Sequence, residues 1–417
     1  MYKRQPYLDA KFRQQYGDVG YYDQKAAIMD QIEGIISDPE VEGTGIKAAL
    51  TTLSQALADF SQSPYQETNA NIVMNAFKGV TQVLNEYDAN LKTLMEQTKN
   101  DLSVAVEDIN TKLDQLSELN SSIAHEIFSN NDYDGVNYGP NDLLDQRNVI
   151  LDDLSRYGDV QVTDLEDGKI QVKINGKVVV DASGASYTND KLNIGSDGVT
   201  LTWNSNNQNA NLGAGAIRGF TDMLTGADPI NAGIPYYQNK MDNFAQTLAD
   251  VFNNKIHADD PDFPDKYKFL LQGGVDGKVT AGNISISDQW ADDVSYIIRK
   301  QNPDGELDNQ DILDMKAAFE QDFNFGGEYT GTFSEFITSV TNTLGSGIKT
   351  NSARMSASLA IAESADSERM GVSGVSLNEE GISMMTYNKA YQALGRLMTT
   401  MDEQLDMIIN KMGIVGR

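Results

Sequence analysis

The feature that most constrains this chain is a strict alternation of apolar positions near its C-terminal end. Large apolar residues recur at intervals of three and then four, the spacing of a heptad seam along one face of an α-helix. The seam positions are Met384, Tyr387, Tyr391, Leu394, Met398, Met401, Leu405, Ile408, Met412 and Val415. They predict an amphipathic helix roughly 50 Å long. Such a stripe needs a cover, which is either the chain's own helical bundle or neighbouring copies.

A second long helical pattern lies in the first third of the chain. From Leu102 to Ile127 its seam again follows intervals of three and four with only Asn120 polar, and the pattern extends back to Leu84. The apolar seam positions are Leu84, Leu91, Leu94, Leu102, Val106, Ile109, Leu113, Leu116, Ile123 and Ile127. Shorter helical patterns predict helices over 7–36, 46–60, 141–157, 235–255, 311–319 and 332–367.

The apolar period changes from helical to strand-like after residue 158. Val160, Val162, Ile170, Val172 and Ile174 alternate or cluster as strand residues do. Asp-Gly at 167–168 and Asn-Gly at 175–176 are strong hairpin turns between them. Further short strands are predicted at 192–194 and 199–203, and the Asn/Gly-rich stretch 204–215 ends the series. These patterns predict a small β domain inserted between helices.

The fold class that these patterns predict is α+β, with a bundle of long, coiled-coil-like helices built from both chain ends. The inserted β domain and the C-terminal amphipathic helix complete it. Three domains are expected. The first is a discontinuous helical domain at 1–157 and 232–375, in which 258–310 is irregular with some strand. The second is the β domain at 158–231, and the third is a C-terminal core helix at 376–417 for subunit assembly. Ser376 and Glu379 have the spacing of a capping box at the start of that helix.

The charge balance and the lack of cysteine exclude several kinds of function. Asp and Glu number 61 against 32 Lys and Arg, a formal net charge of -29 that repels nucleic acid and anionic membranes. There is no cysteine, so disulfides, thiolate catalysis and the usual structural zinc sites are excluded. The sequence shows neither a stretch apolar enough for a membrane helix nor a signal-peptide core at its start, so we expect any export to use a route without a cleaved signal.

No residue pattern supports catalysis, a metal or a cofactor. The two histidines, His125 and His257, stand apart from any nucleophile or zinc motif and are best explained as solvated or capping side chains. The acidic loops 132–135 and 303–308 resemble weak calcium loops, but neither has the full EF-hand layout, so turns are the preferred interpretation. We therefore predict a protein that is not an enzyme and that holds no cofactor.

Three motifs resemble those of bacterial flagellar axial proteins. Ser373-Gly374-Val375-Ser376-Leu377-Asn378-Glu379-Glu380, followed by 387–393, resembles the C-terminal signature of flagellar rod, hook and junction proteins. The segment Asn141-Asp142-Leu143-Leu144-Asp145-Gln146-Arg147 before a β insert, and the return helix at 243–253, resemble the hook-associated protein 1 (FlgK) family specifically. The motifs occur in the family's order, and the resemblance covers nearly the whole chain.

The resemblance implies a structural subunit of the bacterial flagellum. Such a subunit self-associates into the junction ring between hook and filament and templates filament assembly, with terminal helices paired in the inner core. The implied partners are other copies of the chain, the hook protein, the next junction protein and an export chaperone. The implied location is the extracellular flagellum, reached by type III export.

The resemblance also implies a further N-terminal segment. Family members begin with another helix and an Asn-rich turn ahead of the part that resembles residues 2–25 here. We therefore expect either a shortened sequence or a start assigned downstream.

Two alternatives remain at this stage. A secreted surface adhesin would use the β domain, with Trp203 and Tyr187 in a polar setting as its only sequence cue for a glycan site. Within the flagellar class, the filament subunit or hook-associated protein 3 are other possible assignments, but the motif at 141–147 argues against both.

Overall fold

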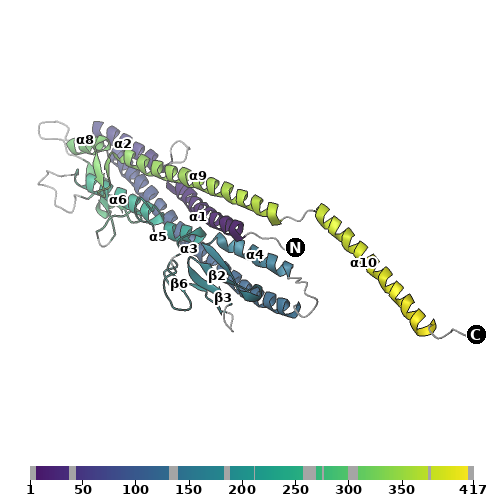
Figure 1. Ribbon diagram of the computed structural model, residues 1–417. Helices are drawn as coiled ribbons and strands as arrows, with labels where there is room; N and C mark the ends of the chain where they lie inside the picture. Colours follow the sequence, from purple (N-terminus) through teal and green to yellow (C-terminus); the bar gives the residue numbers. More distant parts are fainter. Residues whose placement is uncertain are drawn as a thin grey trace, which may run out of the picture. The chain divides into compact units, whose positions relative to one another are not determined.

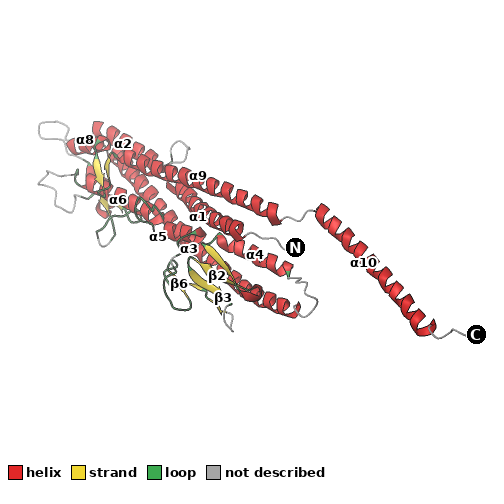
Figure 2. Ribbon diagram, in the orientation of Figure 1, coloured by secondary structure: helices red, strands yellow, loops and turns green. Residues whose placement is uncertain are grey.

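The structure is a computed structural model in which long helices dominate and small antiparallel sheets lie beside them (Figures 1 and 2). It describes residues 6–36, 44–130, 140–182, 188–210, 212–256, 269–274, 277–298, 309–373 and 377–411. The chain forms two compact units, the helical body of residues 10–362 and the terminal unit of residues 1–9 with 363–417. The predicted α+β class with long helices is confirmed.

Helix α3, Glu67–Asn130, is the longest element of the helical body and the one on which the others pack. It follows α2, Gly45–Gln62, after the turn around Pro64, so the two helices form a hairpin. The predicted α3 seam is buried from Leu84 to Ile123, and Asn120 within it is fully buried. Figure 1 places α2 and α8 (Gln310–Ala317) toward one end of α3.

The first helix, α1 (Pro6–Ile36), packs closely against the end of α4, Asn141–Ser155. A Cβ at Gly20 would lie 2.1 Å from the Arg156 carbonyl oxygen, so only glycine permits this approach. The next element in contact is α5, Gly215–Thr225, whose Ala216 N–H donates to the same Arg156 carbonyl at 2.8 Å. The end of α4 therefore joins two helices that are far apart in the sequence.

The inserted sheet has four antiparallel strands in the order of the sequence. They are β1 (Val160–Asp164), β2 (Ile170–Ile174), β3 (Lys177–Asp181) and β4 (Thr188–Asn189), followed by the separate hairpin β5 (Leu192–Ile194) and β6 (Leu201–Trp203). Asn175 and Gly176 both have positive φ, 49° and 81°, as the predicted tight hairpin turn requires. The alternate residues Ile170, Val172 and Ile174 face the core.

Asparagine side chains on α3 hold these strands in place. Asn120 donates from Nδ2 to the Ile170 carbonyl at 2.9 Å and accepts from the Ile170 N–H at 3.2 Å. Asn110 does the same with both backbone groups of Leu192, each at 2.9 Å. Each amide thus satisfies one donor and one acceptor of a strand, as a neighbouring strand would.

The second half of the helical body surrounds an aromatic core. Helix α6, Ile234–Asn253, begins with Pro235 at its first turn and is buried along one face. Its Phe252 stacks on Phe333 at the start of α9 (Phe333–Ser373), and its Phe244 meets the same ring edge-on. The ring centroids of Phe77 on α3 and Trp290 are 5.4 Å apart. Smaller elements fill this end: β7 (Leu271–Gln272), β8 (Ser285–Ile286), α7 (Asp288–Asp292), and the hairpin β9 (Phe323–Phe325) with β10 (Tyr329–Gly331).

Helix α9 begins at a reciprocal capping box. The Glu335 N–H donates to the Thr332 hydroxyl at 3.2 Å, and the Thr332 N–H donates to the Glu335 carboxylate at 2.9 Å. Farther along, α9 packs on α1, where Asn351 donates to the sulfur of Met29 at 3.0 Å. Helices from the two ends of the sequence therefore lie side by side within the helical body, as the sequence predicts.

The last helix is α10, Leu377–Asp406, and a wider π-helical turn at Met407–Lys411 follows it. Both belong to the terminal unit. In the same unit, Arg369 at the end of α9 donates to Asp366 at 2.6 Å and contacts Asp9 at 3.5 Å.

Several short elements were not predicted from the sequence, among them β4 and α7, and two of them are larger. Helix α5 lies within the stretch assigned to the β domain, and the β9–β10 hairpin precedes α9 where no strand was expected. Signals for both were present: Ile217, Phe220 and Leu224 have helical spacing, and Gly326-Gly327 follows alternating phenylalanines. The irregular character expected at 258–310 can be compared only with 269–274, 277–298 and 309–310, since the rest of it lies outside the described residues.

Candidate assembly surface

The predicted C-terminal seam lies on α10, and its described part is fully presented to solvent. None of the α10 residues is buried. The seam side chains Met384, Tyr387, Tyr391, Leu394, Met398, Met401, Leu405 and Ile408 are between 50% and 78% exposed. The last two seam positions, Met412 and Val415, lie outside the described residues. The helix therefore displays a long apolar stripe that an isolated soluble helix would be expected to bury.

Local interactions hold α10 in its helical form. Glu379 and Glu380 lie in the first turn, where negative charge favours the positive end of the helix dipole. The hydroxyls of Thr386, Thr399 and Thr400 donate to carbonyls one turn earlier at 2.7 to 2.9 Å. These contacts lie within the helix itself, so they leave its apolar side available.

Charges on α10 lie away from the seam. Lys389 and Arg396 are one heptad apart, and helical geometry places both on the side opposite the seam. Both residues are exposed. The arrangement leaves the apolar stripe free of basic groups along its middle, which is where a second helix would pack most closely.

The motif at 141–147 divides into a buried face and an exposed face. Arg147 is buried and donates from Nη1 to the Gly168 carbonyl at 2.7 Å and to the Asn120 side chain at 3.4 Å. Its neighbour Asn148 donates to the Leu144 carbonyl at 2.6 Å. Leu143 and Leu144 are half-buried, whereas Asn141, Asp142, Asp145 and Gln146 are exposed. Through these hydrogen bonds Arg147 connects α4 to α3 and to the turn between β1 and β2.

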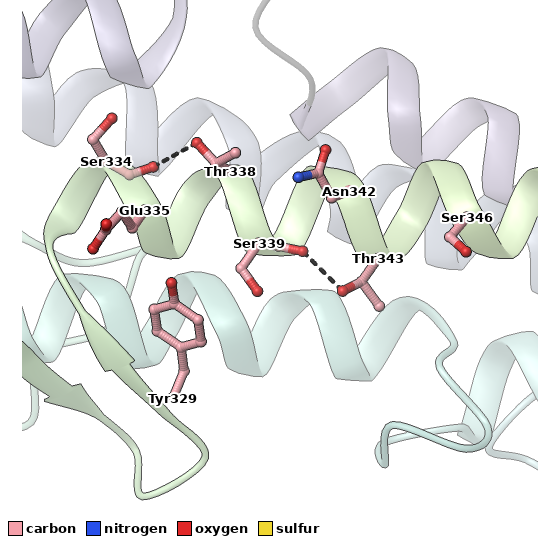
Figure 3. Close-up of a pocket in the computed structure, with 8 residues that line it drawn as sticks. All are labelled: Tyr329, Ser334, Glu335, Thr338, Ser339, Asn342, Thr343 and Ser346. Atoms are coloured by element: carbon pink, nitrogen blue, oxygen red, sulfur yellow. Dashed lines mark hydrogen bonds between the residues drawn. The ribbon is translucent and has the colours of Figure 1, made fainter.

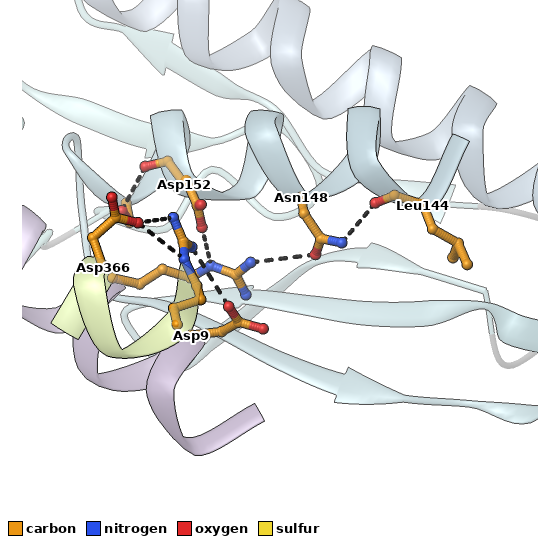
Figure 4. A network of polar contacts seen from close by, with 8 residues as sticks. Asp9, Leu144, Asn148, Asp152 and Asp366 are labelled. Atoms are coloured by element: carbon orange, nitrogen blue, oxygen red, sulfur yellow. Dashed lines mark hydrogen bonds and ion pairs between the residues drawn. The ribbon is translucent and has the colours of Figure 1, made fainter. Parts of the chain in front are cut away.

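A polar network joins this motif to α1 (Figure 4). Arg13 donates from Nε to Asp152 at 2.8 Å and from Nη2 to Asn148 at 3.4 Å. Arg13 is itself buried, and pairing it with a carboxylate offsets the cost of removing its charge from water. The network fixes α1 against α4.

A second polar contact fixes the sheet to α3 near its surface. Asp114 accepts hydrogen bonds from Lys191 and Asn189, each at 2.7 Å. The hydrogen bond from Lys191 is the main reason that the pKa of Asp114 is held below its usual value. The sheet therefore has an ionic contact with α3 as well as its asparagine contacts.

The exposed face of the motif lines a groove between α3 and α4. The groove has a volume of about 840 Å³, with Leu119 and Ile150 among its apolar lining residues and Glu118, Asp142 and Asp145 among its acidic ones. No lysine, arginine or histidine lines it. Its carboxylates and apolar side chains offer no pairing of a nucleophile with a base.

A second depression runs along α9 and has a volume of about 610 Å³ (Figure 3). Hydroxyl groups line most of it, from Ser334, Thr338, Ser339, Thr343 and Ser346. Thr338 and Thr343 donate to carbonyls of their own helix at 2.8 Å. Its carboxylate, Glu335, serves the capping box. Thr338, Thr343 and Glu335 therefore make their hydrogen bonds within α9 and at its start.

Other residues singled out in the sequence have structural explanations or cannot be placed. His125 is exposed on α3. Trp203, the glycan cue of the adhesin hypothesis, is 5% exposed and belongs to the core, so that part of the cue is wrong. His257, Tyr187, Gly374, Val375, Ser376 and both acidic loops lie outside the described residues. The backbone of Ser373 ends α9, and Leu377 opens α10 with 90% of its surface exposed.

The described residues provide neither a membrane-spanning helix nor a metal site. No described helix combines the length and the apolar character needed to cross a bilayer. Within the same residues, no three acidic or histidine side chains are grouped as metal ligands.

Comparison with known families places both parts of the chain among flagellar proteins. The family described as the flagellar hook-associated protein FlgK helical domain matches residues 29–265, more than half of the chain. The chain belongs to the FlgK family. A second family, the flagellar basal body rod FlgEFG protein C-terminal, matches residues 367–411, which include all of α10. The FlgK resemblance inferred from the motifs is thereby confirmed, and the chain has a structural role in the flagellum.

Two individual proteins illustrate the relationship. Flagellar hook-associated protein 1 of Bacillus subtilis (strain 168) is 26% identical over 450 residues, which cover 99% of this chain and 85% of that protein. The flagellar hook junction protein FlgK from Burkholderia pseudomallei matches with a TM-score of 0.47 and 18% identity. That match covers 59% of this chain and 43% of the solved chain, which is less than half of its length.

Proposed function

We propose that this chain self-associates into the junction ring between the flagellar hook and the filament, and that the ring templates filament assembly. The observation that carries the proposal is the exposed seam of α10, together with membership of the FlgK family. A relative over nearly the whole chain is named a flagellar hook-associated protein. The proposed partners are other copies, the hook protein, the next junction protein and an export chaperone.

The size of the α10 seam supports a role in multivalent assembly. Full burial of its large side chains would contribute roughly 10 to 25 kcal/mol as an upper bound. Association itself costs roughly 4 to 15 kcal/mol in lost freedom of motion. Covering a few seam residues therefore does not suffice, and most of the stripe must be buried at once. A helix from a neighbouring subunit, aligned along α10, achieves this.

A ring places a geometric demand on the rest of the chain. Each subunit in a closed ring contacts its neighbour through two different surfaces, because the contact is head-to-tail. Within the proposal, residues 376–417 form the inner assembly helix. The discontinuous helical domain at 1–157 and 232–375 and the inserted domain at 158–231 form the outer part. In this proposal the ring lies outside the cell, at the base of the filament.

Deletion of the gene in its host tests the proposed role. We expect electron microscopy to show hooks without filaments, and we expect flagellin to accumulate in the medium because it has no surface on which to polymerise. Restoring the gene returns filaments. Normal filaments on the deletion strain would exclude the junction role.

A pair of variants then tests the seam itself. Leu394→Asp places a charge in the middle of the seam, whereas Gln392→Asp adds the same side chain two residues away and off the seam. Both positions are exposed, so neither change disturbs a core. We expect the seam variant to fail in restoring filaments and the control to restore them. Equal behaviour of the two variants would show that the seam is not the assembly surface.

A further inference from the structure

Two groups of methionines in this chain differ strongly in exposure. Along α10 and its final turn, Met384, Met385, Met398, Met401 and Met407 are 65%, 58%, 72%, 55% and 55% exposed. In the helical body, Met29, Met74, Met223, Met241 and Met315 are at most 6% exposed. One chain therefore carries accessible thioethers in its proposed assembly helix and protected ones in its core.

An exposed thioether reacts with hydroperoxides without help from the protein. The sulfur attacks the distal oxygen, an S–O bond forms and the O–O bond breaks, and the sulfur loses two electrons. With hydrogen peroxide, the peroxide is reduced to water and the product is methionine sulfoxide. A buried sulfur reacts only when the structure opens locally, which limits its rate.

We propose that the α10 methionines are a modification site for hydroperoxide oxidants, and that their sulfoxides block assembly through this helix. The blocking effect rests on the proposed self-association, whereas the selective oxidation does not. Met384, Met398 and Met401 are seam residues, so each sulfoxide places a polar S=O group where an apolar contact is needed. A polar group buried there without a hydrogen-bond donor opposes association.

The selectivity is tested on the intact chain with hydrogen peroxide and peptide mass spectrometry. We expect the five exposed methionines of α10 and its final turn to oxidise about tenfold faster or more than Met29, Met74 and Met241, because the latter require local opening. Circular dichroism on the same samples checks that the helical body stays folded. Equal rates in the two groups with the body still folded would overturn the proposal.

The effect on assembly is tested by adding treated protein to hooks from the deletion strain and counting filaments after flagellin is supplied. Treated wild type should lose the activity, and treatment with both methionine sulfoxide reductases should restore it. A variant with leucine at 384, 385, 398, 401 and 407 has no thioether at these positions, so treatment should not lower its assembly relative to the untreated sample of the same variant. Met370→Leu, which removes an exposed methionine of α9, is the matched control and should remain sensitive.

The outcomes separate the two proposals. If untreated protein fails to support filaments, the proposed function is at fault and the oxidation rates still decide the modification site. If oxidised wild type supports filaments as well as untreated protein does, the blocking effect is excluded. If the leucine variant is as sensitive as wild type, the methionines of α10 and its final turn are not the cause.

Discussion

Helices α3 and α10 carry the same sequence signal and have opposite surroundings. Both have apolar residues at alternating intervals of three and four. In α3 the seam from Leu84 to Ile123 is at most 7% exposed, with Asn120 fully buried among the leucines and isoleucines. In α10 the least exposed described seam residue, Leu405, still has half of its surface in water. Periodicity therefore identifies an apolar face but does not say which molecule covers it.

The polar residues of the two helices differ in a way that fits their surroundings. On α3, Asn110, Asp114 and Asn120 lie toward the sheet and bind its backbone or side chains. On α10, the hydroxyls of Thr386, Thr399 and Thr400 donate to carbonyls of their own helix. The polar side chains beside the α3 seam thus bind another part of the chain, whereas these three threonines of α10 do not.

The largest expected effect is a difference in unfolding free energy between two matched leucine-to-alanine substitutions. Leu113→Ala leaves a cavity in the buried α3 seam and should lower the free energy of unfolding by about 2 to 5 kcal/mol. Leu394→Ala removes the same side chain from the exposed seam and should change it by no more than about 0.5 kcal/mol. Urea unfolding followed by circular dichroism measures both. Similar losses would mean that the α10 seam is covered within the monomer.

A smaller loss of unfolding free energy is expected from Asn120→Ala. The substitution leaves the buried N–H and carbonyl of Ile170 without their side-chain partner, which should cost about 1 to 3 kcal/mol. Hydrogen exchange should accelerate at the Ile170 amide in particular. Asn100→Ala, at an exposed position of the same helix, should change neither quantity. Unchanged exchange at Ile170 would show that Asn120 does not hold the sheet.

A pH-dependent effect of smaller size is expected at Asp242 of α6. Burial raises the pKa of this carboxyl above its ordinary value of 3.8, although the Ala281 N–H donates to it at 2.8 Å. A raised folded-state pKa gives stability that is present below the unfolded value and is lost as pH rises through the folded value. Asp242→Asn, which retains an acceptor, should therefore be the more stable protein at neutral pH.

Denaturation at a series of pH values measures the effect at Asp242. The stability difference between Asp242→Asn and wild type should be greatest at neutral pH, should shrink as pH falls through the raised folded-state pKa, and should vanish below the ordinary value of 3.8. The exposed Asp250→Asn on the same helix serves as the control. A difference that stays constant with pH would indicate a packing effect and would argue against the raised pKa.

The smallest expected effect on unfolding comes from removing residues 374–417. Because no α10 residue is buried, the unfolding free energy of the helical body should change by less than about 0.5 kcal/mol. The loss of helical signal should match the length of α10, and filament assembly should be abolished. A large fall in the unfolding midpoint would mean that α10 contributes to the body, which would end its contrast with α3.

Much of the fold could be predicted because its signals are local. The long helices, the Asn175-Gly176 turn and the strands before and after it follow from the apolar period and from turn residues. The short α5 and the β9–β10 hairpin were missed, since brief elements provide few periods to count. The hydrogen bonds between the Asn110 side chain and the Leu192 backbone were also not predicted, because the two residues are 82 positions apart in the sequence.

The sequence by itself determined that residues 384–415 have apolar residues at helical spacing, that cysteine chemistry is excluded, and that motifs of the FlgK family are present. Only the tertiary structure decided that Arg147 of the family motif is buried and connects three elements, and that Trp203 is a core residue. It also decided that the α3 seam is covered while the described α10 seam is exposed. The physical reason is that apolar spacing depends on neighbours along the chain. Burial depends on which distant segments fold against them.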